Sequence, residues 1–168
     1  MTGVQTCALP ICFAGSSEGD FEAVSAIAAE MKYSAVASLS RAVERDIIMS
    51  ARAVEKAVHP VIHTFIATSE IHMKNKLRMT PEQVYDSALS AVRLAKKYTP
   101  VVEFSCEDAT RSDREFLYKI LEGVINEGAT VVNIPDTVGY ILPAEYFELI
   151  QDIRRNVKNI KLAEISVH

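Results

Sequence analysis

The chain has 168 residues, 49% of them hydrophobic and 24% charged, with 22 acidic against 18 basic residues and a formal net charge of −4. This composition is typical of a globular domain and excludes a disordered or collagen-like chain, while the absence of a basic block argues against nucleic-acid binding. No apolar run reaches the roughly 18 residues that a membrane span needs, so we expect a cytoplasmic protein without membrane partners.

The first twelve residues, MTGVQTCALPIC, match nothing that follows them, and we expect residues 1–12 to be a non-native leader. They lack the positively charged start of a secretory signal peptide, and Pro10 interrupts their apolar stretch. The three cysteines, Cys7, Cys12 and Cys106, have no disulfide-framework spacing, which favours reduced thiols in a reducing compartment.

Five short runs rich in β-branched residues recur along the chain. They are nearly continuous apolar segments, as expected of strands that are covered on both faces. The predicted strands are 34–39 (SAVASL), 60–66 (PVIHTFI), 100–105 (PVVEFS), 130–135 (TVVNIP) and 161–168 (KLAEISVH).

Helical patterns precede and separate these runs. Asp20 is the predicted cap of the first helix, and the apolar face of the second is predicted to extend to Val58. Thr80, followed by Pro81 and by Gln83 at the capping-box position, predicts the start of the third helix.

The last two helices also carry end signals. The segment Ser112-Asp113-Arg114-Glu115 predicts a capping box that starts the fourth helix, and Gly128 is placed to end it. Pro143 is predicted to open the final helix, with Phe147 on its buried face.

Strict alternation of strand and helix requires right-handed crossovers and a parallel sheet. An open doubly wound sheet and a (β/α)8 barrel both satisfy this pattern. The chain has no Gly-rich nucleotide loop, and polar residues collect where successive strands end, as in barrel enzymes. We therefore predict an α/β fold in which residues 13–168 form a partial (β/α)8 TIM barrel, with about five to six of the eight βα units.

Several polar residues near the strand ends are candidates for chemistry. His63 is either a hydrogen-bonded core histidine or a site residue. Glu103 and Glu107, four residues apart, are either an acid/base pair or substrate clamp, or a solvated pair. Cys106 between them is expected to be a small buried thiol, because no activating base is evident.

Two further segments end in polar residues. Asp136 and Thr137 follow the fourth predicted strand, where a hydroxyl and backbone N–H groups suit a substrate carboxylate, although turn chemistry alone would explain these residue types. His168 follows the fifth strand and is a candidate metal ligand, but one histidine does not make a site.

Five motifs, taken together and in this order, resemble the 2-isopropylmalate synthase family. They are FAGSSEGDFE (13–22), HTFIATS (63–69), EFSCED (103–108), NIPDTVGY (133–140) and ISVH (165–168). The resemblance covers residues 13–168 and is specific as a combination, whereas any single motif also fits homocitrate and citramalate synthases.

This resemblance implies a Claisen condensation of acetyl-CoA with a 2-oxo acid, 3-methyl-2-oxobutanoate, on the catalytic pyruvate carboxyltransferase-like barrel, in leucine biosynthesis. It also implies a divalent metal ion (Mg, Mn or Zn) and a homodimeric parent. Carried over residue by residue, His168 would be a metal ligand, and Thr137 would bind the substrate carboxylate. His63, Glu103 and Ser105 would line the substrate pocket, and Glu107 would be the catalytic residue that positions the reacting groups.

The family's Asp-Thr-Thr-Leu-Arg-Asp-Gly motif and its second metal-binding histidine are absent here. We therefore expect a fragment, truncated at both ends, that is inactive by itself. Two alternatives remain: a homocitrate or citramalate synthase of the same family, and a non-catalytic half-barrel that serves as a binding module.

Overall fold

A computed structural model describes residues 13–168 of the chain. The predicted leader, residues 1–12, lies outside the described residues together with Cys7 and Cys12. Within the described part of the chain, no helix is long and apolar enough to cross a membrane.

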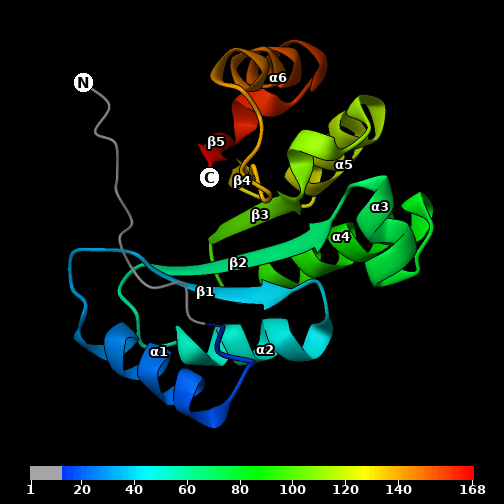
Figure 1. The fold of residues 1–168 in the computed structure, drawn as a ribbon. Coiled ribbons are helices and arrows are strands. Elements are labelled where there is room, and N and C mark those ends of the chain that lie inside the picture. The colour runs from blue at the N-terminus through cyan, green and yellow to red at the C-terminus, as the bar shows by residue number, and fades with distance from the viewer. Residues whose placement is uncertain (1–12) are drawn as a thin grey trace.

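The five predicted strands are all present and form one parallel sheet in the consecutive order β1-β2-β3-β4-β5 (Figure 1). A doubly wound sheet reverses its strand order at a switch point, whereas a (β/α)8 barrel adds strands consecutively. The order therefore confirms the predicted α/β fold with barrel-type topology. The strand bounds are Val36–Arg41, Pro60–Ala67, Val101–Glu107, Val131–Ile134 and Glu164–Val167.

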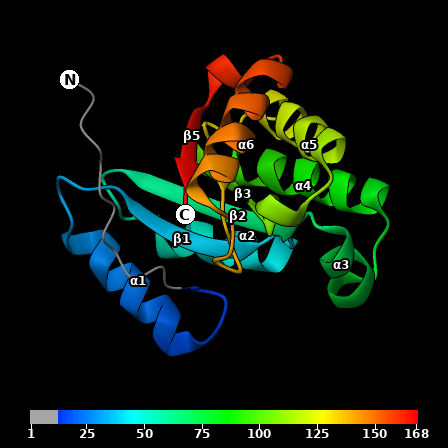
Figure 2. The same cartoon turned by 45° about the horizontal axis from the view of Figure 1, so that its top comes forward.

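Helices cover the outer side of the curved sheet, and the strand directions turn progressively from β1 to β5 (Figures 1 and 2). The major helices are α1 (Glu18–Glu30), α2 (Glu44–Ala53), α4 (Pro81–Ala95), α5 (Arg114–Asn126) and α6 (Pro143–Asn156). Short elements complete the fold: α3 (Glu70–His72), a π-helical turn η1 (Met73–Leu77), and 3-10 turns at Ala109–Arg111 and Ile160–Leu162.

The two faces of the sheet differ in chemistry because side chains alternate along each strand. Val102, Phe104 and Cys106 of β3 point to the helix side and are fully buried in the apolar core. Glu103 and Ser105 alternate with them and therefore lie on the concave inner face. The sequence thus separates a helix-covered core face from an inner face that carries polar groups.

Two predicted helix caps are wrong, the first by three residues and the second by one residue. The N-cap of α1 is Ser17, whose hydroxyl accepts the Asp20 N–H, so Asp20 lies inside the first turn. The N-cap of α5 is Asp113, which accepts the Phe116 N–H, and no capping box forms from Ser112. The Ser112 hydroxyl instead forms hydrogen bonds with Thr68 and with the Asp108 carbonyl oxygen. Asp113 therefore takes the N-cap position.

Other end signals are confirmed. Thr80 and Gln83 form the predicted capping box of α4, and Gly128 adopts a φ of 107° just beyond α5. Two predicted apolar faces are wrong in part. Val58 lies beyond the end of α2 and is half exposed, and Phe147 is 64% exposed on the outer side of α6, where Leu149 and Ile153 supply the buried contacts.

Candidate active site

A polar cluster occupies the inner face of the sheet, where β2, β3 and β4 lie side by side. Strand register places His63 beside Glu103, and Ser105 beside Asn133. His63 Nε2 lies 2.6 Å from Ser105 Oγ, and Asn133 Nδ2 donates to the same oxygen over 2.8 Å. His63 Nδ1 lies 3.8 Å from a Glu103 carboxylate oxygen. Three of the predicted substrate-binding residues, His63, Glu103 and Ser105, therefore lie together.

His63 is neutral near pH 7. Burial, together with a smaller electrostatic effect of His168, lowers the pKa of its imidazole to about 4. Burial also raises the pKa of the adjacent Glu103 carboxyl group. A neutral imidazole can offer one N–H donor and one nitrogen acceptor, which suits recognition of a carbonyl or carboxylate oxygen.

This pKa shift predicts an acid-sensitive fold. Between pH 6.5 and about 4 the unfolded chain binds a proton at His63 that the folded chain does not, so the free energy of unfolding falls as the pH is lowered through this range. The whole shift corresponds to about 3 kcal/mol. Urea unfolding of the purified chain at several pH values measures this loss.

The matched variants for that experiment are His63→Gln and His59→Gln, the second of which removes an exposed histidine. His63→Gln is expected to flatten the dependence between pH 4 and 6.5, and His59→Gln is expected to retain the slope of the parent. Equal slopes for the parent chain and for His63→Gln would contradict the buried, neutral state of His63.

Glu103 and Glu107 do not form an acid/base pair, which excludes one interpretation of their spacing. Four residues along a strand correspond to about 13 Å. Glu103 faces His63, whereas Glu107 ends β3 and forms an ion pair of 2.6 Å with Lys76 of η1. The two carboxylates therefore act in different surroundings.

Asp108 joins three loops at the carboxyl ends of the strands. Its carboxylate is fully buried and accepts hydrogen bonds from Ser69 (2.5 Å), His72 (2.8 Å) and both Nε and a terminal nitrogen of Arg111 (2.8 and 2.7 Å). Its backbone N–H donates to Thr137 Oγ1 over 2.9 Å. Burial raises the pKa of this carboxyl group, but the bonds from Arg111, Ser69 and His72 outweigh that effect and leave the pKa lowered.

Thr137 and His168 lie near the ends of β4 and β5. Because Thr137 Oγ1 accepts the Asp108 N–H, its own hydroxyl proton remains able to donate to a ligand. His168 is exposed, and its carbonyl oxygen accepts the Asp136 N–H over 2.8 Å, which ties the loop after β4 to the end of β5. The structure therefore brings Glu107, Asp108 and Thr137 to one edge of the sheet, with His168 at the end of its last strand.

Cys106 is fully buried on the helix side of β3, and burial raises the pKa of its thiol well above the ordinary value. A thiol in this state is not a nucleophile, as the sequence predicts. It is the free cysteine of the described residues.

The described residues do not by themselves fit a metal ion. They contain no group of three or more His, Cys, Asp and Glu side chains that could hold one. Zinc sites in proteins use three or four such ligands, so a zinc ion bound through His168 would need ligands from outside residues 13–168.

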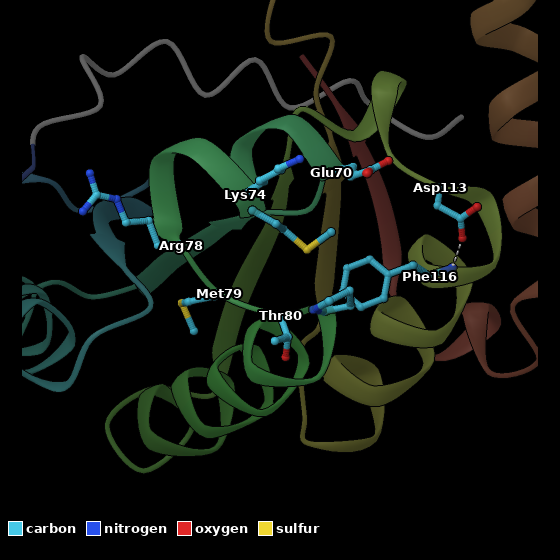
Figure 3. A pocket seen from close by; sticks show the side chains of 9 residues that line it. Glu70, Lys74, Arg78, Met79, Thr80, Asp113 and Phe116 are labelled. Carbon is cyan, nitrogen blue, oxygen red and sulfur yellow. Dashed lines mark hydrogen bonds between the residues drawn. The ribbon is translucent and has the colours of Figure 1, made fainter.

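A separate cavity of about 670 Å³ lies between η1 and the first turns of α4 and α5 (Figure 3). Its wall carries two acidic and two basic side chains, Glu70 and Asp113 against Lys74 and Arg78, with Phe116 among its apolar contacts. None of the predicted site residues lines it, so we place the candidate site at the strand ends instead.

Sequence reasoning missed Asp108 and Lys76 as parts of this region. Asp108 stands at the end of the EFSCED motif, directly after a strand, and that position was the available signal. Lys76 carries no such signal, because its contact with Glu107 depends on η1, which the sequence pattern did not predict.

Comparison with known proteins supplies independent evidence. The sequence model described as HMGL-like matches residues 3–168. The chain is 58% identical to the 2-isopropylmalate synthase of Aquifex aeolicus over 156 residues, which cover 93% of this chain and 30% of that protein. It is 56% identical to the 2-isopropylmalate synthase of Pyrococcus abyssi over 153 residues, 91% of this chain and 32% of that protein. The chain therefore spans about a third of the length of these curated relatives.

Proposed function

This chain belongs to the HMGL-like family, and we propose that it is part of a 2-isopropylmalate synthase. The proposed reaction joins acetyl-CoA to 3-methyl-2-oxobutanoate in leucine biosynthesis. The single observation that carries the proposal is the inner-face cluster of His63, Glu103 and Ser105, in a chain that is 58% identical to an enzyme of that name. Thr137 and Glu107 follow or end the neighbouring strands β4 and β3.

The proposed chemistry begins with removal of a methyl proton from acetyl-CoA. The methyl carbon then forms a bond to C2 of the oxo acid, whose carbonyl oxygen takes up a proton and becomes a hydroxyl group. Water cleaves the thioester and releases CoA. Polar groups that are already oriented stabilise such developing oxygen charge better than solvent does.

In this proposal each residue has a role that its geometry permits. The Thr137 hydroxyl donates to the substrate carboxylate, and neutral His63 donates to a substrate oxygen. Glu103 and Ser105 contact the same imidazole on the inner face, and Glu107 positions the reacting groups from the end of β3. A divalent metal ion would supply Lewis-acid polarisation of the carbonyl when bound, with His168 as one ligand. The described residues alone do not complete the site of that ion.

The proposal extends to a homodimeric, cytoplasmic parent protein. The buried, unpaired Cys106 supports a reducing compartment, in which free thiols persist.

A chimera tests the proposed function in a full-length context. Residues 13–168 of this chain replace the matching segment of the Aquifex aeolicus 2-isopropylmalate synthase, which is 58% identical. Release of CoA is then measured with each of three oxo acids, namely 3-methyl-2-oxobutanoate, pyruvate and 2-oxoglutarate. We expect kcat/KM to be highest with 3-methyl-2-oxobutanoate. A higher value with pyruvate or 2-oxoglutarate would favour a citramalate or homocitrate synthase, and a folded chimera without turnover would favour a binding module.

A further inference from the structure

Three side chains from neighbouring strands form a hydrogen-bonded chain across the inner face. Asn133 of β4 contacts Ser105 of β3, which contacts His63 of β2. All three are at least nine-tenths buried, with exposed fractions of 6%, 6% and 8%. Because these three side chains are buried, each hydrogen-bonding proton has few acceptors within reach. The donor and the acceptor of each bond can therefore be assigned.

The direction is set at Asn133. Its Nδ2 amide group can only donate, and it donates to Ser105 Oγ over 2.8 Å. The serine hydroxyl has one proton of its own, which needs an acceptor. Among the contacts of residues 13–168, the acceptor within reach is His63 Nε2, 2.6 Å away. A buried hydroxyl proton without a partner is costly, so Ser105 donates to Nε2.

The other side of the imidazole ring agrees with this assignment. If Nε2 accepts a proton, a neutral imidazole carries its hydrogen on Nδ1. Nδ1 faces a Glu103 carboxylate oxygen, and a carboxylate favours an N–H over a nitrogen lone pair. The separation of 3.8 Å between Nδ1 and the Glu103 carboxylate oxygen is longer than a hydrogen bond. The Nδ1–H group is therefore free to donate to a ligand.

We propose that Asn133 is a positioning residue that acts through Ser105 to hold His63 as the neutral tautomer with its proton on Nδ1. Ser105 is then a relay between Asn133 and His63, and its proton is not available to a substrate. The amide oxygen of Asn133 is buried and has no hydrogen-bond partner among the described residues. If the proposed function holds, the Nδ1–H group of His63 is the donor that meets an oxygen of the 2-oxo acid.

Nitrogen-15 NMR of the histidine side chains tests this proposal without any need for activity. The chain has four histidines, so the imidazole signals can be assigned by comparison with His63→Gln. At neutral pH we expect His63 to show a protonated Nδ1 and an unprotonated Nε2. A protonated Nε2 in the parent protein would overturn the proposal.

Asn133→Asp is the informative variant because it keeps the shape and replaces the donor by an acceptor. The Ser105 hydroxyl then donates to the new carboxylate and accepts a hydrogen bond from His63 Nε2. The proton of the neutral imidazole therefore moves from Nδ1 to Nε2. Asn156→Asp makes the same change at an exposed position at the end of α6 and should leave His63 unchanged. A folded Asn133→Asp protein with the parent tautomer would overturn the proposal.

Should a buried carboxylate prevent folding, Asn133→Ala and Ser105→Ala provide a second test in the chimera. Because Asn133 acts through Ser105, Asn133→Ala should change kcat and KM in the parent background and change neither in the Ser105→Ala background. Additive losses would contradict the relay. An inactive chimera would count against the proposed function only, since the NMR result on the tautomer does not depend on turnover.

Discussion

Asp108→Ala is expected to lower the free energy of unfolding by about 3 kcal/mol, among the largest losses for a single substitution in this chain. The variant removes a fully buried carboxylate that accepts hydrogen bonds from Ser69, His72 and Arg111. It also places alanine at a φ of 64°, a left-handed conformation that Asp and Asn tolerate better. Urea unfolding of the purified chain measures the loss.

Two further variants separate the causes of that loss. Asp108→Asn keeps the left-handed backbone and removes the charge, so it should recover part of the stability. Asp152→Ala is the matched control, since Asp152 forms a long, exposed ion pair of 3.7 Å with Arg155 and should cost under about 1 kcal/mol. Similar losses for Asp108→Ala and Asp152→Ala would show that the network around Asp108 does not stabilise the fold.

The network around Asp108 is also expected to weaken in acid. The pKa of Asp108 is lowered in the folded chain, so its contribution is present above the ordinary pKa of 3.8 and is lost as the pH falls further. This range lies below that of His63, whose loss begins near pH 6.5. The two groups can therefore be distinguished by the pH at which each variant departs from the parent.

Glu107→Gln is expected to lower kcat of the chimera by about 100-fold or more, with kcat/KM falling in parallel. The amide keeps the shape of the side chain and removes the negative charge that sits at the end of β3 and pairs with Lys76. A group that positions reacting atoms should affect the transition state more than the binding of the oxo acid. Steady-state kinetics of CoA release give both constants.

The control for this substitution is Glu148→Gln, because Glu148 is exposed on α6 and away from the strand ends. It should leave both constants within about twofold of the parent chimera. Turnover of the Glu107→Gln chimera at a similar rate would remove Glu107 from the catalytic machinery.

The order of the elements could be predicted from the sequence because it depends on local signals. Continuous β-branched runs predicted all five strands. The Thr80 capping box predicted the start of α4, and Gly128 predicted the end of α5. The predicted fifth strand starts too early, since Ile160–Leu162 forms a 3-10 turn before β5 begins at Glu164. Local signals therefore determine which elements form, and boundaries shift where a turn competes.

The contacts of the candidate site could be predicted only in part. His63, Glu103 and Ser105 lie on one face because residues two apart on a strand share a face and the strands are in register. The bonds that join Asp108 to Ser69, His72 and Thr137 span 29 to 39 positions of the sequence, and they depend on a left-handed backbone that no short motif encodes. The predicted N-cap at Ser112 is wrong because of another contact between residues far apart in the sequence. The Ser112 hydroxyl forms a hydrogen bond with Thr68 of another loop.

The product that the chimera forms from acetyl-CoA labelled with carbon-13 at its methyl group and 3-methyl-2-oxobutanoate tests the central claim most directly. We predict labelled 2-isopropylmalate and an equal amount of free CoA, both strongly reduced by Glu107→Gln. A folded chimera that releases no labelled product, under conditions in which the parental Aquifex aeolicus enzyme does, would show that residues 13–168 do not form the catalytic segment of such an enzyme.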